Sequence, residues 1–258
     1  APNNSPKWCF QHRKPKGVLY PQKSSACGTN SWSPDDPQMH RAQMTLPILY
    51  SFRRCPYAIR ARLALQISAI STDLREIVLR DKAPAFLSIS PSQSVPCLQH
   101  ENFVIDESLD IMIWALRQND PQGWLKMPDA GYALIEQNDG AFKAALDRTK
   151  YPNRFPQDDP LKNRQIASEF LQLLNEQLQA GFLFGPTATL ADSAILPFVR
   201  QFAFINKPWF DAQPWPYVQR WLEGFLGSDA FHLVMQKYPK WQYGDPPTLF
   251  PSLQKHHV

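Results

Sequence analysis

The segment LPILYSFRRCPYAIRARLALQISA, residues 46–69, decides the fold of this 258-residue chain. It opens with a short, nearly continuous apolar run, which predicts a strand buried on both faces of a sheet. A helix with one apolar face follows, because Ile59, Leu63 and Ile67 recur at a spacing of four. A strand joined so closely to a helix is the usual opening of a βαβ unit.

The elements expected after this helix complete a small α/β domain. We expect a second strand at 74–79, a helix at Pro84–Ile89, a hairpin that turns at Glu101-Asn102, and a closing helix from Ser108. The order βαβ-α-ββ-α over about 75 residues is that of a thioredoxin-like domain.

Past a link that contains Pro and Gly, the sequence predicts helices only. Their apolar periodicity places them at 130–148, 160–179, 189–204 and 216–226. The third of these begins with Thr189-x-x-Asp192, which has the form of a capping box with Asp in place of Glu. The fold class is therefore an α/β domain followed by an all-helical domain.

The domain boundaries follow from these changes of pattern. We expect a thioredoxin-like domain at 44–119, a linker at 120–129, an all-helical domain at 130–243 and a C-terminal tail at 244–258. Residues 1–43 are rich in Pro, Ser, Asn and Lys without periodicity. They are either a disordered extension or non-native sequence upstream of a start at Met44.

The net charge of +4 belongs to one end of the chain, because residues 1–43 hold six Lys or Arg against two Asp and the rest is neutral. A neutral body gives no reason to expect nucleic acid or a membrane as a partner. The four cysteines are too few for a disulfide scaffold, and the six histidines show no metal-ligand spacing. We therefore expect a cytoplasmic protein without a metal.

Cys55 precedes Pro56, which suits the first turn of a helix, so the cysteine is expected at or near the N-cap. There, unpaired backbone N–H groups and the helix macrodipole favour an anion, and such sites lower a cysteine pKa from about 8.5. Arg53 and Arg54 would add to this effect if they point inward. The alternative is a buried structural cysteine.

Ala58 stands where a dithiol motif would place its second cysteine, so Cys55 has no resolving thiol on its own turn. A disulfide with Cys97 is the alternative, but that side chain is expected to alternate away from the site. A monothiol needs a partner thiol from another molecule, because exchange proceeds through a mixed disulfide. Glutathione is the obvious candidate.

Three short motifs stand in order before the helical region: Cys55-Pro56-Tyr57-Ala58, Val95-Pro96 and Glu107-Ser108. With these motifs, the chain from Met44 to about Tyr243 resembles a cytosolic glutathione transferase, in particular a cysteine-type, omega-like bacterial member. They match the catalytic turn of that family, its Val-Pro pair with a cis proline, and its Glu-Ser dipeptide at the start of the third helix.

The resemblance implies a role for each position. Cys55 would be the catalytic thiol, and Val95 would pair its backbone with the cysteinyl part of glutathione. Pro96 would hold that backbone through a cis bond. Glu107 and Ser108 would bind the γ-glutamyl end, although both also suit an ordinary helix cap with Ser108 at the N-cap.

Two further assignments leave alternatives open. Lys82 would contact the glycyl end of glutathione, but Ala83 separates it from the proline that follows directly in the family, and Lys82 also suits a solvated surface. Tyr57 would either activate a thiol or pack inside the first helix.

The function implied is a glutathione-dependent thiol transferase or reductase that acts through a Cys55–glutathione mixed disulfide. Its substrate would be a small-molecule or protein mixed disulfide, and the family implies a homodimer. Conjugation of glutathione to electrophiles and a non-catalytic binding or stress protein are the alternatives.

Overall fold

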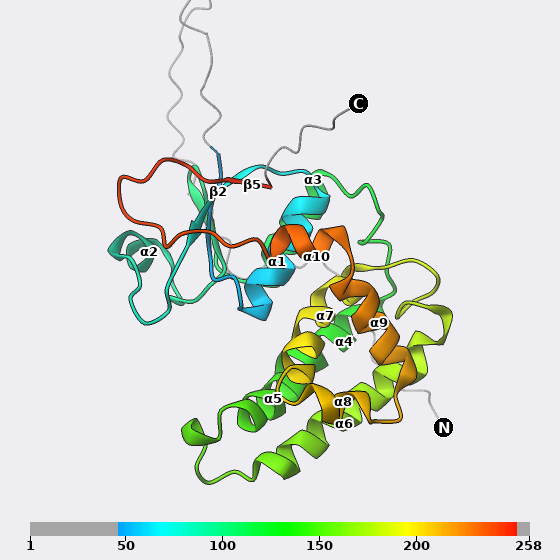
Figure 1. The fold of residues 1–258 in the computed structure, drawn as a ribbon. Helices are drawn as coiled ribbons and strands as arrows, with labels where there is room; N and C mark the ends of the chain where they lie inside the picture. Colours follow the sequence, from blue (N-terminus) through cyan, green and yellow to red (C-terminus); the bar gives the residue numbers. More distant parts are fainter. Residues whose placement is uncertain (1–45, 252–258) are drawn as a thin grey trace, which may run out of the picture.

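The computed structural model describes residues 46–251, so the predicted extension at 1–43 lies outside it. Within this range the chain forms a thioredoxin-like α/β domain followed by a helical domain (Figure 1), which confirms the predicted fold class. The described part of the C-terminal segment crosses back over the sheet of the first domain.

A mixed five-stranded sheet organises the first domain, in the order β4-β3-β1-β2-β5. β1 and β2 are parallel, and the other neighbouring pairs are antiparallel. The strands are β1 (Ile48–Ser51), β2 (Thr72–Glu76), β3 (Cys97–His100), β4 (Phe103–Ile105) and β5 (Leu249–Phe250). The prediction of a strand at 74–79 was misplaced, because the chain leaves the sheet after Glu76 and Val78 bridges to Asp81 in a turn.

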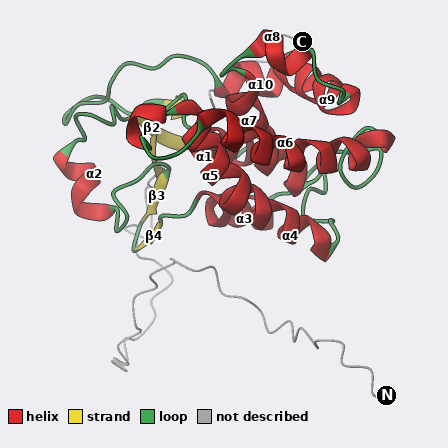
Figure 2. Cartoon of the chain, turned by 90° about the horizontal axis from the view of Figure 1, so that it is seen from below, coloured by secondary structure: helices red, strands yellow, loops and turns green. Residues whose placement is uncertain are grey.

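Three helices cover the two faces of this sheet: α1 (Pro56–Ile67), α2 (Pro84–Ile89) and α3 (Ser108–Gln118). Successive residues of a strand point to opposite faces. Leu49 accordingly packs in the core with α1 and α3, while Tyr50 packs on the other face with Phe86 of α2. Figure 2 shows α1 and α3 between the strands and the helical domain.

The second domain contains the α-helices α4 (Asp129–Gln137), α5 (Lys143–Lys150), α6 (Pro160–Gln177), α7 (Leu190–Ala203), α8 (Lys207–Asp211), α9 (Pro216–Leu226) and α10 (Asp229–Val234). The bounds of α9 are those predicted. A π-helical turn, η1 (Asn138–Phe142), joins α4 to α5 where one helix was expected. α8 and α10 were missed because helices of five and six residues are too short to show a period.

The C-terminal segment adds a strand where only helices and a tail were expected. β5 pairs with β2, and the Thr248 N–H donates to the Asp73 carboxylate at 2.9 Å. Trp241 packs edge-on against Tyr50 at 6.0 Å, with the Arg75 guanidinium 4.4 Å from its ring. The segment thus covers the outer edge of β2, which would otherwise expose unpaired backbone groups.

The capping box of α7 is present as predicted. The Thr189 N–H and hydroxyl both donate to Asp192 Oδ2 at 2.8 Å, and the Leu183 N–H donates to Oδ1 at 3.0 Å. Asp192 is fully buried, and burial raises its pKa while these donors oppose the shift. One carboxylate therefore fixes both the start of α7 and the loop before it.

We predict that Asp192→Ala lowers the free energy of unfolding by about 3 kcal/mol, because a cap is lost and buried donors lose their acceptor. Asp159→Ala is the control, since Asp159 caps α6 in an exposed position, where its carboxylate accepts from the Leu161 N–H. That loss should be about 1 kcal/mol. Urea denaturation measures both, and equal losses would contradict the assignment.

Candidate active site at the Cys55 turn

The candidate site lies where β1 leads into α1. Cys55 is the N-cap residue of α1 and Pro56 its first residue, as predicted. The thiol donates to the Val95 carbonyl oxygen, with 3.6 Å between Sγ and O. The Val95–Pro96 peptide is cis. The fold therefore brings the Cys-Pro turn and the Val-Pro pair into contact across 40 residues of sequence.

The pKa of Cys55 shifts in the direction opposite to the prediction. Burial raises the pKa of the thiol, and the backbone N–H groups of Ala58 and Tyr57 oppose this shift without reversing it. The expected lowering was wrong because desolvation outweighs the helix terminus. The cations that lower the thiol pKa most are Lys143 and Arg62, rather than the adjacent arginines.

The other described cysteine does not form a pair with Cys55. Cys97 is fully buried, and both cysteines are free thiols. Cys97 lies opposite Tyr50 in the β1–β3 ladder, and its side chain packs in the cluster that contains Phe86. Burial also raises the pKa of Cys97. Its position is that of a small core residue.

A buried ion pair holds the Cys55 turn from two sides. The Arg53 N–H donates to Glu76 Oε1 at 2.6 Å, and Arg62 Nη2 donates to the Arg53 carbonyl oxygen at 2.7 Å. Arg62 and Glu76 lie 3.8 Å apart between Nη1 and Oε2, and the Arg62 side chain is fully buried. The two hydrogen bonds that hold the turn are therefore made by the main chain of Arg53 and not by its side chain.

The electrostatics of this pair reflect its burial. Burial lowers the pKa of Arg62 to about 10 and raises the pKa of Glu76, while each partner opposes the shift of the other. The Trp241 N–H donates to the Glu76 carbonyl oxygen at 3.0 Å, which joins the C-terminal segment to the same point. Arg62 and Glu76 were not predicted as site residues. They are far apart along the chain, so no local pattern in the sequence indicates that they pair.

A second buried arginine connects the site to the helical domain. The Arg60 guanidinium makes a bidentate pair with the Asp139 carboxylate at 2.8 and 2.7 Å. Its Nε donates to Ser108 Oγ at 2.9 Å. Because Ser108 is the acceptor in this bond, its own hydroxyl proton remains available for donation. Asp139 lies in the π-helical turn and was also missed from sequence.

The remaining predicted residues are Tyr57, Glu107 and Lys82. The Tyr57 ring packs edge-on against Phe198 of α7 at 4.7 Å, and burial raises the Tyr57 pKa to about 12. These observations favour a packing role for Tyr57. Glu107 is the N-cap residue of α3, so the predicted cap at Ser108 was wrong by one position. The half-buried Lys82 donates to the Gln93 carbonyl oxygen at 2.9 Å.

Two general properties hold for residues 46–251. No cluster of three or more His, Cys, Asp or Glu side chains in this range could hold a metal ion. None of its helices combines the length and the apolar character that crossing a membrane requires.

Comparison with known proteins gives the class of this fold and site. Residues 49–123 match the family model "Glutathione S-transferase, N-terminal domain", and residues 133–224 match "Glutathione S-transferase, C-terminal domain". Together the two models cover more than half of the chain. The protein therefore belongs to the glutathione S-transferase family.

Individual relatives are distant. Glutathione S-transferase L3 of Arabidopsis thaliana is 24% identical over 71% of this chain and 79% of its own length. Glutathione S-transferase U22 of the same plant is 35% identical, but the match covers only 25% of this chain and 30% of that protein. A glutathione transferase family member from Pseudomonas fluorescens pf-5, solved with two glutathione bound, has a TM-score of 0.65 at 17% identity, covering 77% of this chain and 96% of its own.

We predict that Glu76→Ala lowers the free energy of unfolding by about 3–5 kcal/mol, because it leaves the Arg62 charge buried and uncompensated. The same change removes the acceptor of the Arg53 N–H. Glu136→Ala, at an exposed position of α4, is the control and should be neutral within about 0.5 kcal/mol. Denaturation of the two variants tests this, and a neutral Glu76→Ala would show that the ion pair does not hold the turn.

The raised thiol pKa predicts how Cys55 reacts. The rate of alkylation by iodoacetamide should keep rising past about pH 8.5, the ordinary cysteine range, because only the thiolate reacts. Lys143→Ala should slow the reaction at pH 8, since it removes a charge that lowers the pKa, whereas Lys150→Ala should not. Mass spectrometry of the Cys55 peptide gives the rate. A plateau below pH 8 would contradict the assignment.

Proposed function

We propose that this glutathione S-transferase family member is a glutathione-dependent thiol transferase or reductase of the cysteine, omega-like type. The observation that carries the proposal is the position of Cys55, at the N-cap of α1 and 3.6 Å from the Val95 carbonyl oxygen. A thiol at this turn can form a covalent bond with the glutathione sulfur, whereas a hydroxyl could only donate a hydrogen bond to it. A homodimer and a cytoplasmic location remain predictions.

Glutathione would lie along the edge that these motifs form. Its cysteinyl backbone would pair with Val95 beside Pro96, in the manner of an added strand. The γ-glutamyl ammonium would bind the Glu107 carboxylate, and its carboxylate would accept from the Ser108 hydroxyl, which Arg60 leaves free to donate. The Lys82 ammonium donates one N–H to the Gln93 carbonyl oxygen, and another of its three N–H groups would bind the glycyl carboxylate.

Glutathione binding would also change the state of Cys55. In the free protein the Val95 carbonyl accepts from the thiol, which favours the protonated form. A glutathione N–H that pairs with this carbonyl would compete with the thiol for the same acceptor. Loss of that bond lowers the thiol pKa, so the nucleophile would become more reactive when its partner is bound.

The reaction consists of two exchanges. The Cys55 thiolate attacks the glutathionyl sulfur of R–S–S–G; a disulfide bond between Cys55 and glutathione forms, the S–S bond of R–S–S–G breaks, and RS⁻ leaves and takes a proton from solvent. The thiolate of a second glutathione then attacks the same sulfur. Oxidised glutathione leaves, and the Cys55 thiolate is restored. In sum, R–S–S–G and one glutathione yield R–SH and oxidised glutathione.

Turnover with hydroxyethyl disulfide and glutathione tests the proposal. We predict thiol-transferase activity and an adduct on Cys55 whose mass is that of one glutathione, both lost in Cys55→Ala. Cys97→Ala is the matched control and should keep both, because that thiol is fully buried. A wild-type protein with neither rate nor adduct would overturn the proposal.

The wild type and Cys55→Ala also distinguish the proposed function from its alternatives. If Cys55→Ala conjugates glutathione to chlorodinitrobenzene, the scaffold still activates glutathione and the cysteine sets the reaction type. If the wild type conjugates this electrophile but forms no Cys55 adduct, it is an ordinary conjugating transferase. Retention on a glutathione column without either activity identifies a non-catalytic binding protein.

A further inference from the structure

Arg200, near the C-terminal end of α7, is half-buried and has no acidic partner within residues 46–251. It takes part in none of the salt bridges found there, and its Nε is buried without a hydrogen-bond partner. The guanidinium carbon instead lies 5.3 Å from the ring centres of both Phe204 and Phe231. A charge taken partly out of water without a counterion is unfavourable, so Arg200 favours an anion supplied by another molecule.

Arg53, two residues before Cys55, brings a second positive charge close to Arg200. Its main chain holds the turn, whereas its half-buried side chain forms no salt bridge within residues 46–251. Burial is the largest cause of the lowered pKa of Arg200, and the charge of Arg53 lowers it further. Two cations repel each other, and an anion bound between them would remove this repulsion. We call Arg53 and Arg200 the unpaired arginines, since neither has an acidic partner in the described part of the chain.

The acidic groups near the turn are already in use. Glu76 lies within range of the Arg53 charge, but its carboxylate pairs with Arg62 and accepts from the Arg53 N–H. Lys143, a cation whose charge opposes the effect of burial on the thiol pKa, pairs with Asp147. Because Glu76 cannot neutralise Arg62 and the unpaired arginines together, the described residues leave an excess of positive charge beside the turn.

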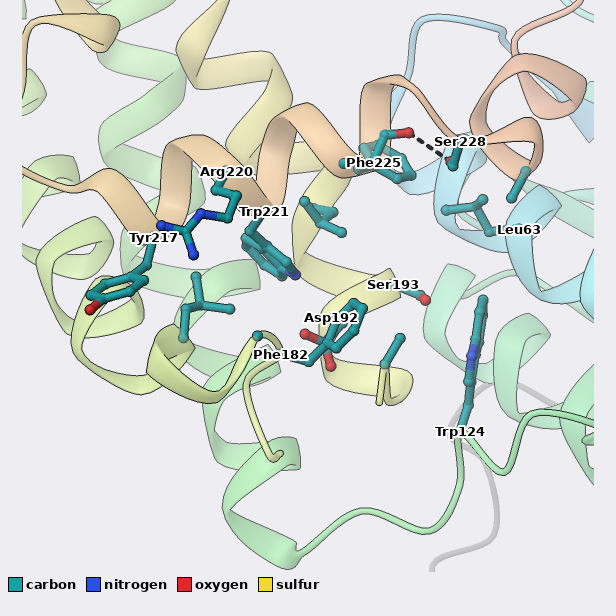
Figure 3. Close-up of a pocket in the computed structure, with 16 residues that line it drawn as sticks. Leu63, Trp124, Phe182, Asp192, Ser193, Tyr217, Arg220, Trp221, Phe225 and Ser228 are labelled. Carbon is teal, nitrogen blue, oxygen red and sulfur yellow. Dashed lines mark hydrogen bonds between the residues drawn. The ribbon is translucent and has the colours of Figure 1, made fainter. Parts of the chain in front are cut away.

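Phe231 of α10, which the Arg200 guanidinium contacts, is fixed by the corner between α9 and α10. The Ser228 hydroxyl donates to the Phe225 carbonyl oxygen at 2.7 Å, the bond drawn in Figure 3. The same Ser228 oxygen accepts from the Phe231 N–H at 3.2 Å, and the Phe225 and Phe231 rings lie 4.8 Å apart. α10 in turn packs against α1. Arg200 therefore lies on a fixed wall, as a preorganised binding group requires.

We propose that the unpaired arginines bind an acidic group on the thiol that the reaction releases, so that the preferred substrate is a mixed disulfide between glutathione and a small carboxylic thiol. This inference rests on the proposed function. In R–S–S–G the sulfur of R is bonded to the sulfur that Cys55 attacks, so a short R group lies beside the turn that carries Arg53. A guanidinium donates two parallel N–H groups to a carboxylate, which makes this acid a suitable counterion. Glutathione would use Val95, Glu107 and Ser108, which leaves the unpaired arginines for R.

Charged methanethiosulfonates test this site in the absence of glutathione. Each reagent R–S–SO₂CH₃ transfers R–S to the Cys55 thiolate, and methanesulfinate leaves. We expect the negative sulfonatoethyl reagent to react about tenfold faster than the positive trimethylammonioethyl reagent, after each rate is divided by its rate with free 2-mercaptoethanol. Mass spectrometry of the Cys55 peptide gives the rates.

Three variants assign this preference to one side chain. Arg200→Gln should lower the ratio of the two rates about five- to tenfold, whereas Arg200→Lys, which keeps the charge, should retain most of it. Arg220→Gln is the matched control, because it removes the same charge from an exposed position of α9, away from Ser228 in Figure 3. Thermal denaturation shows that the variants remain folded. A wild-type ratio of about one, or a ratio that Arg200→Gln leaves unchanged, would overturn the proposal.

Turnover separates this inference from the proposed function. The substrates are mixed disulfides of glutathione with 3-mercaptopropionate, 2-mercaptoethanol and cysteamine, whose charges are negative, zero and positive. We expect kcat/KM to favour the acid over the neutral substrate about tenfold, and Arg200→Gln to reduce this preference about fivefold. Turnover of the neutral disulfide without a preference for the acid contradicts the inference alone. A wild type that turns over none of the three contradicts the proposed function, and the reagent ratio then decides by itself whether the unpaired arginines bind an acid beside Cys55.

Discussion

The main chain of Arg53 is held between two oppositely charged side chains, and the position of the thiol depends on this contact. Glu76 from the end of β2 accepts the N–H, and Arg62 from α1 donates to the carbonyl. β2, α1 and the turn that joins β1 to α1 are thereby fixed to one another two residues before Cys55. Because both charges are buried, neither can be removed without leaving the other uncompensated.

α1 carries the residues that connect this turn to the rest of the molecule. Its N-terminus carries Cys55, Arg62 holds the turn, and Arg60 binds Ser108 of the first domain and Asp139 of the second. The same helix packs against α3 and α7. A nucleophile at its start is thus supported by side chains of both domains, which is the support that a preorganised site requires.

The desolvation of the thiol and its hydrogen bond to Val95 describe a resting state rather than an activated one. Burial raises the pKa of Cys55, so the free protein keeps its sulfur mainly protonated near neutral pH. A ligand that takes the Val95 carbonyl as its own acceptor would shift that balance. In the proposed function, therefore, binding of glutathione would favour the thiolate form of Cys55.

Local signals in the sequence were sufficient for the elements that carry the motifs. Pro56 marked the start of α1, and the apolar period of α9 gave its bounds. Contacts between distant segments could not be predicted: Arg60 and Asp139 are 79 residues apart, and β5 has only two residues. The sign of the Cys55 pKa shift also required the structure, because a helix start is visible in sequence and desolvation is not.

A crystal structure of the protein after treatment with oxidised glutathione tests the central claim most directly. The account predicts a disulfide between Cys55 Sγ and the glutathione sulfur, with the cysteinyl backbone of glutathione paired to Val95 and its γ-glutamyl end at Glu107 and Ser108. Glutathione bound at this edge with its sulfur unbonded to Cys55, or a disulfide with the peptide lying away from Val95, would contradict it.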